Sequence, residues 1–300
     1  MNSQAATVET ALSSAHGRAA AYFELTKPRV LLMVLITTLA GFYMGSGADF
    51  DFLIALNALA GTAFAAGGTL ALNQYFERDT DAMMDRTRNR PVPSGRLRPV
   101  EALIFGLVTT AAGCGYLWVA VNPLSAAVTA TITVLYLGAY TPMKRVSWLC
   151  HAVGAVPGAL PPVIGWAAAR GSLAAEPLVL FGIMFLWQLP HSLSIARLYQ
   201  TDYARAGIRL LPEDGAYGNP ANTLMLAASV MLVVIGMLPT LMGFAGDVYL
   251  LVAIVLGAAM LFFGIRLALT PATASAARRV MMASLVYLPA VLLVMVLDKV

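Results

Sequence analysis

The sequence predicts an all-α integral membrane protein with nine transmembrane helices and a cytoplasmic N-terminus. Of its 300 residues, 59% are hydrophobic and only 11% are charged, whereas about 25% of the residues in a soluble domain are charged. A soluble fold of this length has too little interior to hide so much apolar surface. Apolar runs of about 20 residues, the length that crosses a bilayer, recur along the chain.

The first part of the chain, residues 1–21, is polar and rich in alanine. It lacks the basic stretch followed by an apolar segment that is typical of a signal peptide. We therefore expect residues 1–21 to be a disordered cytoplasmic tail and residues 22–300 to form a single transmembrane domain.

Nine apolar runs in the remaining chain are long enough to be membrane spans. Short polar or helix-breaking turns separate several of them, as at Asp49–Asp51, Asn122–Pro123 and Gly246–Asp247. The predicted spans are 29–46, 52–75, 100–121, 124–141, 147–168, 177–199, 222–244, 248–269 and 279–297.

The distribution of basic residues predicts the orientation. With the N-terminus in the cytoplasm, every lysine and arginine except Arg170 and Lys299 falls on the cytoplasmic side, as the positive-inside rule requires. The two long connections, at about 76–99 and 200–221, fall on that side too, and function is often carried by such loops. We expect the active site to face the cytoplasm.

Topology also explains the net charge of +4, so nucleic-acid binding is not indicated. The two cysteines, Cys114 and Cys150, lie in or next to apolar segments and form no CxxC pair. They indicate neither a disulfide framework nor a metal site.

The most informative stretch runs from Asn73 to Arg98 and concentrates charge between two apolar runs. If the second span continues as a helix, Asn73, Glu77, Asp81 and Asp85 follow one another at steps of four and share one stripe, while Asp79 points away. Carboxylate and amide oxygens that converge in this way suit Mg²⁺, which completes its ligand shell with water and substrate phosphate.

Arginines follow this stripe directly, at positions 86, 88 and 90, and arginine is well suited to bind phosphate oxygens. Two prolines and a glycine then end the helix and turn the chain back over the acidic face. The stretch predicts a metal–diphosphate site. The alternative is a solvated loop whose charges neutralise each other, but solvation alone does not explain oxygen donors at steps of four.

A second group of polar residues, Tyr140 to Arg145, separates the fourth and fifth spans, and Pro142 ends the helix there. Lys144 and Arg145 stand at the membrane edge. They either anchor the helix, as the positive-inside rule predicts, or hold a leaving diphosphate beside the metal site.

A third group surrounds His191, which lies inside an apolar span after Pro190. A lone buried histidine is most often a hydrogen-bonding core residue. Here Gln188 and Asp202 lie near the same helix end, which makes His191 a functional candidate. His151, near the start of the fifth span, has weaker support.

At these residues the sequence resembles the UbiA-type intramembrane prenyltransferases. That superfamily carries an N-x-x-x-D/E-x-x-x-D helix followed by an R-x-x-N-R-P-x-x-S/K-G turn. The matching residues are Asn73, Glu77, Asp81, Arg86, Asn89, Arg90, Pro91, Ser94 and Gly95.

Further motifs resemble the haem O synthases (protohaem IX farnesyltransferases) within that superfamily. They are Glu24–Arg29, Asn73–Asp81, Tyr140–Arg145, Gly154–Trp166, Trp187–His191 and Asp202–Ile208. The second D-x-x-x-D of many UbiA-type enzymes is absent from the sixth span, where His191 and Ile195 stand instead.

The resemblance implies transfer of a farnesyl group from farnesyl diphosphate to a vinyl group of haem B, which gives haem O for haem–copper oxidases. It implies Mg²⁺ as the cofactor, a multi-pass location in the cell inner membrane, and haem A synthase or oxidase assembly factors as partners. The implied metal ligands are Asn73, Glu77, Asp81 and Asp85. The implied diphosphate ligands are Arg86, Arg90, Tyr140, Lys144 and Arg145. The implied acceptor-site candidates are Trp187, Gln188, Tyr199 and Asp202.

Under this reading His191 contacts the haem, as an axial ligand of the iron or as a guide for the water that supplies the hydroxyl group; the sequence leaves both roles open. Two other functions are alternatives. A UbiA-type enzyme could instead use a quinone precursor or a chlorin as acceptor. A transporter would place its charges on broken helices near mid-membrane and show an internal repeat, whereas the acids here gather at one rim.

Overall fold

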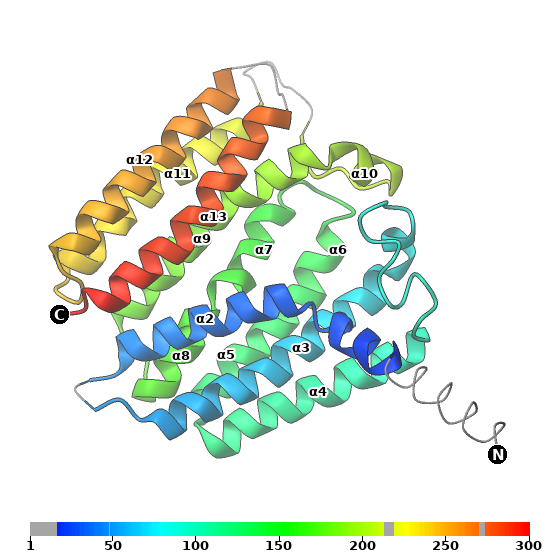
Figure 1. Ribbon diagram of the computed structural model, residues 1–300, viewed down its shortest axis with the longest axis horizontal. Coiled ribbons are helices and arrows are strands. Elements are labelled where there is room, and N and C mark those ends of the chain that lie inside the picture. Colours follow the sequence, from blue (N-terminus) through cyan, green and yellow to red (C-terminus); the bar gives the residue numbers. More distant parts are fainter. Residues whose placement is uncertain (1–16, 48, 213–218, 270–273) are drawn as a thin grey trace, which may run out of the picture.

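The computed structural model describes residues 17–47, 49–212, 219–269 and 274–300 (Figure 1). Within these ranges nine helical segments are long and apolar enough to cross a membrane, which confirms the predicted count. The only β-type pairing among these residues is an isolated bridge between Ala245 and Lys299. The chain is therefore an all-helical, multi-pass membrane protein.

The observed spans lie within a few residues of the predicted ones at most ends. They are α2 (Pro28–Gly45), α3 (Phe52–Ala82), α4 (Pro99–Ala120), α5 (Pro123–Val134) continued by η1 (Leu135–Tyr140) and α6 (Thr141–Met143), α7 (Cys150–Ala159) continued by α8 (Pro161–Arg170), α9 (Ala175–Leu198), α11 (Pro220–Leu241), α12 (Asp247–Leu269) and α13 (Ala274–Leu297). A short helix, α10 (Gln200–Arg205), lies between the sixth and seventh spans.

Local sequence explains where these helices begin. The Asp51 side chain caps α3 by accepting hydrogen bonds from the backbone N–H groups of Leu53 and Ile54, and Asn122 caps α5 in the same way. Proline, whose missing N–H costs nothing in the first turn of a helix, begins α2, α4, α5, α8 and α11.

The predicted disordered tail does not extend to residue 21, because residues 17–25 are helical. Ala21 and Leu25 are almost fully buried and pack with Ala71, Val92 and Leu97. This apolar contact supplies the burial that orders the segment. Residues 1–16 lie outside the described part of the chain.

The helices form two groups with the first half of the fifth span, α7, between them. Figure 1 shows α9, α11, α12 and α13 on one side and α2, α3, α4, α5 and α8 on the other, with α7 between. The segment 83–98, α10 and the helix at residues 17–25 lie at one end of the bundle, and the C-terminus lies at the opposite end. This arrangement agrees with an odd number of crossings.

Close backbone contact joins α2 to α8. A Cβ atom on Gly165 would lie 1.9 Å from the carbonyl oxygen of Thr38, so only glycine allows the two helices to approach so closely. Outside the bundle, large apolar side chains such as Trp118, Val119 and Leu241 are exposed, as expected for surfaces that face lipid rather than water.

Candidate active site

The polar stripe predicted on the second span exists, but it is shorter than expected. Helix α3 continues past the predicted end of the span to Ala82, so Asn73, Glu77 and Asp81 share one face. Asn73 is fully buried and Asp81 is 1% exposed. Asp79 points away, with a side chain that is 76% exposed. Asp85 follows the helix end, so the predicted continuation of the stripe to Asp85 is wrong.

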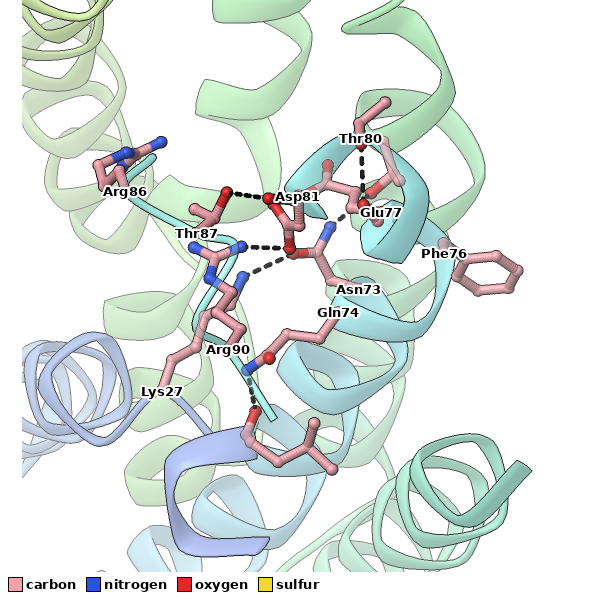
Figure 2. A network of polar contacts seen from close by, with 12 residues as sticks. Lys27, Asn73, Gln74, Phe76, Glu77, Thr80, Asp81, Arg86, Thr87 and Arg90 are labelled. Atoms are coloured by element: carbon pink, nitrogen blue, oxygen red, sulfur yellow. Dashed lines mark hydrogen bonds and ion pairs between the residues drawn. The ribbon is translucent and has the colours of Figure 1, made fainter. Parts of the chain in front are cut away.

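Each oxygen-bearing side chain of the stripe is bound to a cationic side chain from another part of the chain. Lys27 Nζ donates a hydrogen bond to Asn73 Oδ1 at 2.6 Å, and Figure 2 shows this region. Lys144 Nζ lies 2.7 Å from Glu77 Oε1. Arg90 lies 2.6 Å from Asp81 Oδ2. We call these six residues, Lys27, Asn73, Glu77, Asp81, Arg90 and Lys144, the rim cluster.

Lys27 was not predicted as a site residue, although it lies within the motif Glu24–Arg29. It has a left-handed backbone conformation (φ 50°) immediately before Pro28, the first residue of α2. Non-glycine residues adopt this conformation at a cost of about 1–2 kcal/mol. Burial and the neighbouring Arg90 lower the pKa of Lys27 to about 7.

Lys144, the partner of Glu77, follows a helical segment that changes its period. The segment η1 is a π-helix, a distortion that often marks functional sites. Its last residue, Tyr140, places its ring 4.4 Å from Lys144 Nζ. Burial alone would lower the pKa of Lys144, but the Tyr140 ring and the Glu77 carboxylate hold that pKa well above its usual value.

The next residue of the fourth span also joins this region. The Thr141 hydroxyl accepts a hydrogen bond from Asn73 Nδ2 at 3.2 Å and donates one to the carbonyl oxygen of Tyr136 at 2.8 Å. Asn73 is thus oriented from both ends of its amide, with its oxygen toward Lys27. The periodicity of the sequence carries no signal for this contact, since it depends on the π-helix.

Other predicted site residues lie away from the rim cluster. Arg86 donates a hydrogen bond to the Tyr203 hydroxyl at 3.0 Å and packs over the rings of Tyr199 and Tyr203. Arg145 donates to the backbone carbonyl of Phe76 at 3.4 Å.

The predicted residues Asp85 and Asp202 form a separate set of ion pairs. Asp85 pairs with Arg88 and Arg205, and Asp202 pairs with Arg205 at 3.5 Å. The half-exposed Arg205 and Asp85 side chains therefore link the segment after α3 to α10.

A cavity of about 560 Å³ opens inside the bundle next to the rim cluster, within the usual size range of ligand pockets. Its wall is mostly apolar and comes from α2, α3, the fourth and fifth spans, α9 and α13. Tyr136 and Tyr140 line it on the side of Lys144, and Trp187, Gln188 and His191 line it from α9.

Ring stacking and neutral hydrogen bonds fix the side chains on the α9 side of the cavity. The Trp187 ring stacks on the His191 ring with centroids 4.9 Å apart. Trp187 Nε1 donates to the backbone carbonyl of Ser284 at 2.8 Å, and His191 Nδ1 lies 2.7 Å from the Ser284 hydroxyl. We call Trp187, His191 and Ser284 the histidine wall. Ser284, on α13, was not predicted because small polar residues in an apolar span carry no distinctive signal.

Two glycines of α7 make room for site side chains. A Cβ atom on Gly154 would lie 2.5 Å from the Tyr140 ring, and one on Gly158 would lie 2.0 Å from Gln188 Oε1. In the structure they position residues that line the cavity.

The chemistry of the rim cluster fits Mg²⁺. Asn73, Glu77 and Asp81 offer hard oxygen donors of the kind this ion prefers, and each donor already holds a positively charged group. No three His, Cys, Asp or Glu side chains gather as a metal site in the described ranges. The protein supplies two carboxylates and an amide, and water and phosphate oxygens complete such a shell.

The chain is similar to known proteins over most of its length. A model of the UbiA prenyltransferase family matches residues 34–286. The chain is 44% identical over 287 residues to a curated protein from Solibacter usitatus named protoheme IX farnesyltransferase, which covers 93% of this chain and 98% of the relative. These findings confirm the predicted resemblance.

Solved structures show the same fold. A digeranylgeranylglyceryl phosphate synthase structure matches with a TM-score of 0.79 at 16% identity, covering 94% of this chain and 98% of that one. A UbiA homologue from Archaeoglobus fulgidus bound to GPP and Mg²⁺ matches with a TM-score of 0.66 at 17% identity, covering 92% of this chain and 99% of that one.

Proposed function

The chain belongs to the UbiA prenyltransferase family, and on this premise we propose that it transfers a farnesyl group from farnesyl diphosphate to a vinyl group of haem B (protohaem IX). The products are haem O, for haem–copper oxidases, and diphosphate. The observation that carries the proposal is the rim cluster beside an apolar cavity, in a chain whose curated relative is named protoheme IX farnesyltransferase.

The basic residues of the rim cluster would bind the diphosphate. Lys27, Arg90 and Lys144 pair with Asn73, Asp81 and Glu77, and diphosphate oxygens would replace these partners. Asn73, Glu77 and Asp81 would hold Mg²⁺, which neutralises charge on the leaving diphosphate. Tyr140, whose ring contacts Lys144, would bind the diphosphate beside the cluster, and Arg86 and Arg145 would have to leave their present partners to reach it.

The cavity would protect the reacting carbon. When the bond between farnesyl C1 and diphosphate oxygen breaks, its electron pair leaves with the diphosphate. The allylic cation that remains would be trapped by free water, and an apolar chamber excludes that water. The side chains of Val34, Leu70 and Ile132 line this chamber.

The acceptor would complete the reaction from the α9 side. The vinyl group's π electrons form the new carbon–carbon bond to farnesyl C1. A water oxygen then bonds to the carbon next to the macrocycle and loses one proton, which leaves a hydroxyl group. Trp187, Gln188 and His191 line this side of the cavity, while Tyr199 and Asp202 would act from its cytoplasmic edge.

We further propose that the protein lies in the cell inner membrane with the rim cluster facing the cytoplasm, where farnesyl diphosphate is soluble. The rim cluster lies at the end of α3 that leads into the long segment 83–98. The asymmetry of basic residues supports this orientation. Haem A synthase or oxidase assembly factors are the partners we expect to receive the product.

The test is a prenylation assay with the full-length protein in detergent, containing haem B, farnesyl diphosphate and Mg²⁺, with pigments separated by chromatography. We expect haem O to form, to disappear when Mg²⁺ is chelated, and to be lost in an Asp81→Asn variant. Prenylation of a quinone precursor or a chlorin, with haem B left unchanged, would contradict the proposed acceptor while preserving the metal–diphosphate site.

A further inference from the structure

The hydrogen bonds around His191 indicate which ring nitrogen carries its proton. The Ser284 hydroxyl has a single hydrogen, which it donates to the carbonyl oxygen of Met281 at 2.6 Å. The same hydroxyl oxygen lies 2.7 Å from His191 Nδ1 and can only accept there. Nδ1 therefore carries the hydrogen of the neutral imidazole, and Nε2 has a free lone pair.

That lone pair is available to a ligand. His191 lines the cavity, and among the residues that the structure describes, Nε2 forms no hydrogen bond. The ring cannot turn easily, because Trp187 stacks on it at an interplanar angle of 16° and Trp187 is itself fixed to the Ser284 carbonyl. One residue of α13 thus positions both rings of the histidine wall.

The second histidine in the cavity wall is bonded through its other ring nitrogen. His151 Nε2 lies 3.0 Å from the carbonyl oxygen of Leu210, and a carbonyl only accepts hydrogen bonds. Its Nε2 therefore carries the hydrogen and is occupied. His151 keeps a lone pair on Nδ1, so hydrogen bonding alone does not separate the two histidines. His191 differs because the stacked Trp187 ring and the Ser284 hydroxyl hold its ring in place.

The surroundings of His191 favour metal binding over proton transfer. Met184, Leu285 and Leu288 line the cavity with it, and no carboxylate in the described ranges is bonded to its ring. An imidazolium formed here would be a buried, unpaired charge, which is costly. A neutral imidazole with one N–H donated to the protein and the other nitrogen free is the usual form of a metal-ligating histidine.

We propose that His191 Nε2 ligates the iron of the porphyrin acceptor, and that Ser284 and Trp187 are positioning residues for this bond. The inference rests on the proposed function, because that function brings haem into the cavity. It adds a rule of substrate selection: the site recognises a porphyrin by its metal, so an iron-free porphyrin binds more weakly. The bond also fixes the macrocycle at one wall, so its vinyl edge can face the rim cluster.

The experiment is a titration of the full-length protein in detergent with ferric protoporphyrin IX and, in parallel, with metal-free protoporphyrin IX. We expect the wild type to give the absorption and electron paramagnetic resonance spectra of histidine-ligated iron. It should also bind the ferric porphyrin roughly tenfold or more tightly than the metal-free one. Equal affinity for the two porphyrins would overturn the inference without any mutation.

Three variants sharpen the titration. His191→Ala should lose the histidine signature, and added imidazole should restore it. His151→Gln, the matched control from the same cavity wall, should keep the signature. Ser284→Ala should keep the ligand but shift the iron–histidine stretching frequency of the ferrous complex, because Nδ1 loses its acceptor. A role of Ser284 in packing alone would leave that frequency unchanged.

The prenylation assay run on the same samples separates the two proposals. Haem O production by the wild type, with identical iron spectra in wild type and His191→Ala, would overturn iron ligation and leave the proposed function standing. No haem O and no binding of ferric porphyrin by the wild type would overturn both.

Discussion

The rim cluster and the histidine wall adjoin the same cavity, but they are held by different forces. In the rim cluster the carboxylates and their cations meet as ion pairs, as between Glu77 and Lys144 at 2.7 Å. In the histidine wall the contacts are neutral hydrogen bonds and ring stacking, as between Trp187 and His191. The charged partners in the rim cluster can be replaced by other charged groups. The neutral contacts of the histidine wall allow only one arrangement of its side chains.

This difference matches what the proposed function requires of each region. A diphosphate and its metal would enter the rim cluster by replacing partners that here satisfy one another. A flat acceptor needs a wall whose geometry exists before it binds, because preorganised contacts lose little entropy on binding. Variants in one region should therefore leave the binding properties of the other unchanged.

The largest expected effect comes from removing a rim carboxylate. Glu77→Gln should lower kcat by about 100-fold, since one stabilising group for charge in the transition state is lost. The affinity for ferric protoporphyrin IX should not change. Asp79→Asn, on the same helix but exposed and facing away, is the control and should keep normal turnover. A weaker porphyrin affinity in Glu77→Gln would contradict the independence of the two regions.

The next largest effect is on stability, and it tests whether ion pairing stabilises the rim cluster. Lys144→Met leaves the mostly buried Glu77 carboxylate without its partner, which should cost about 3 kcal/mol in the free energy of unfolding. The double variant Glu77→Gln/Lys144→Met should regain most of this loss. Arg88→Met, which breaks an exposed pair with Asp85, should change stability by less than about 1 kcal/mol.

Unfolding midpoints in detergent measure these differences. If the double variant is as unstable as Lys144→Met alone, Lys144 acts through packing against Tyr140 rather than through its charge.

Two glycine variants on the same helix, α7, should each affect only one of the two regions. Gly154→Ala pushes against the Tyr140 ring and should raise KM for farnesyl diphosphate roughly tenfold. Gly158→Ala displaces Gln188 toward the cavity and should weaken porphyrin binding by a similar factor. Gly115→Ala, where a Cβ atom meets nothing within 4 Å, should behave as wild type. Equal effects of both variants on both substrates would show that the cavity responds as one unit.

The smallest effect is expected from Trp187→Phe. The variant keeps a ring that can stack on His191 but loses the hydrogen bond from Nε1 to the Ser284 carbonyl. One neutral hydrogen bond contributes about 1 kcal/mol, so porphyrin affinity should fall about fivefold, measured by the same titration. The control, Trp118→Phe on the exposed face of α4, should leave porphyrin affinity unchanged. Unaltered affinity in Trp187→Phe would mean that stacking alone orients His191.

Several features could be predicted from the sequence because each depends on residues that are neighbours along the chain. Span positions follow from local hydropathy, helix starts follow from residues such as Asp51 and Pro28, and the stripe of Asn73, Glu77 and Asp81 follows from helical spacing. Asp85 was misassigned for a local reason too: the helix end at Ala82 falls before the prolines that were expected to stop it.

The cationic partners of Asn73 and Glu77 could not be predicted, since they come from positions far away in the sequence. Lys27 meets Asn73 across 46 residues and Lys144 meets Glu77 across 67. His191 meets Ser284 across 93. The left-handed backbone at Lys27 and the π-helix before Lys144 are stabilised by packing, not by local propensity.

The sequence by itself determined that the chain crosses the membrane, where its helices lie and which residue types gather at one rim, because hydropathy and helical period act over a few turns. Only the tertiary structure decided which cation holds which oxygen and which nitrogen of His191 is free. Those outcomes depend on how α2, α3, the fourth span, α9 and α13 pack around one cavity, and no short segment encodes that packing.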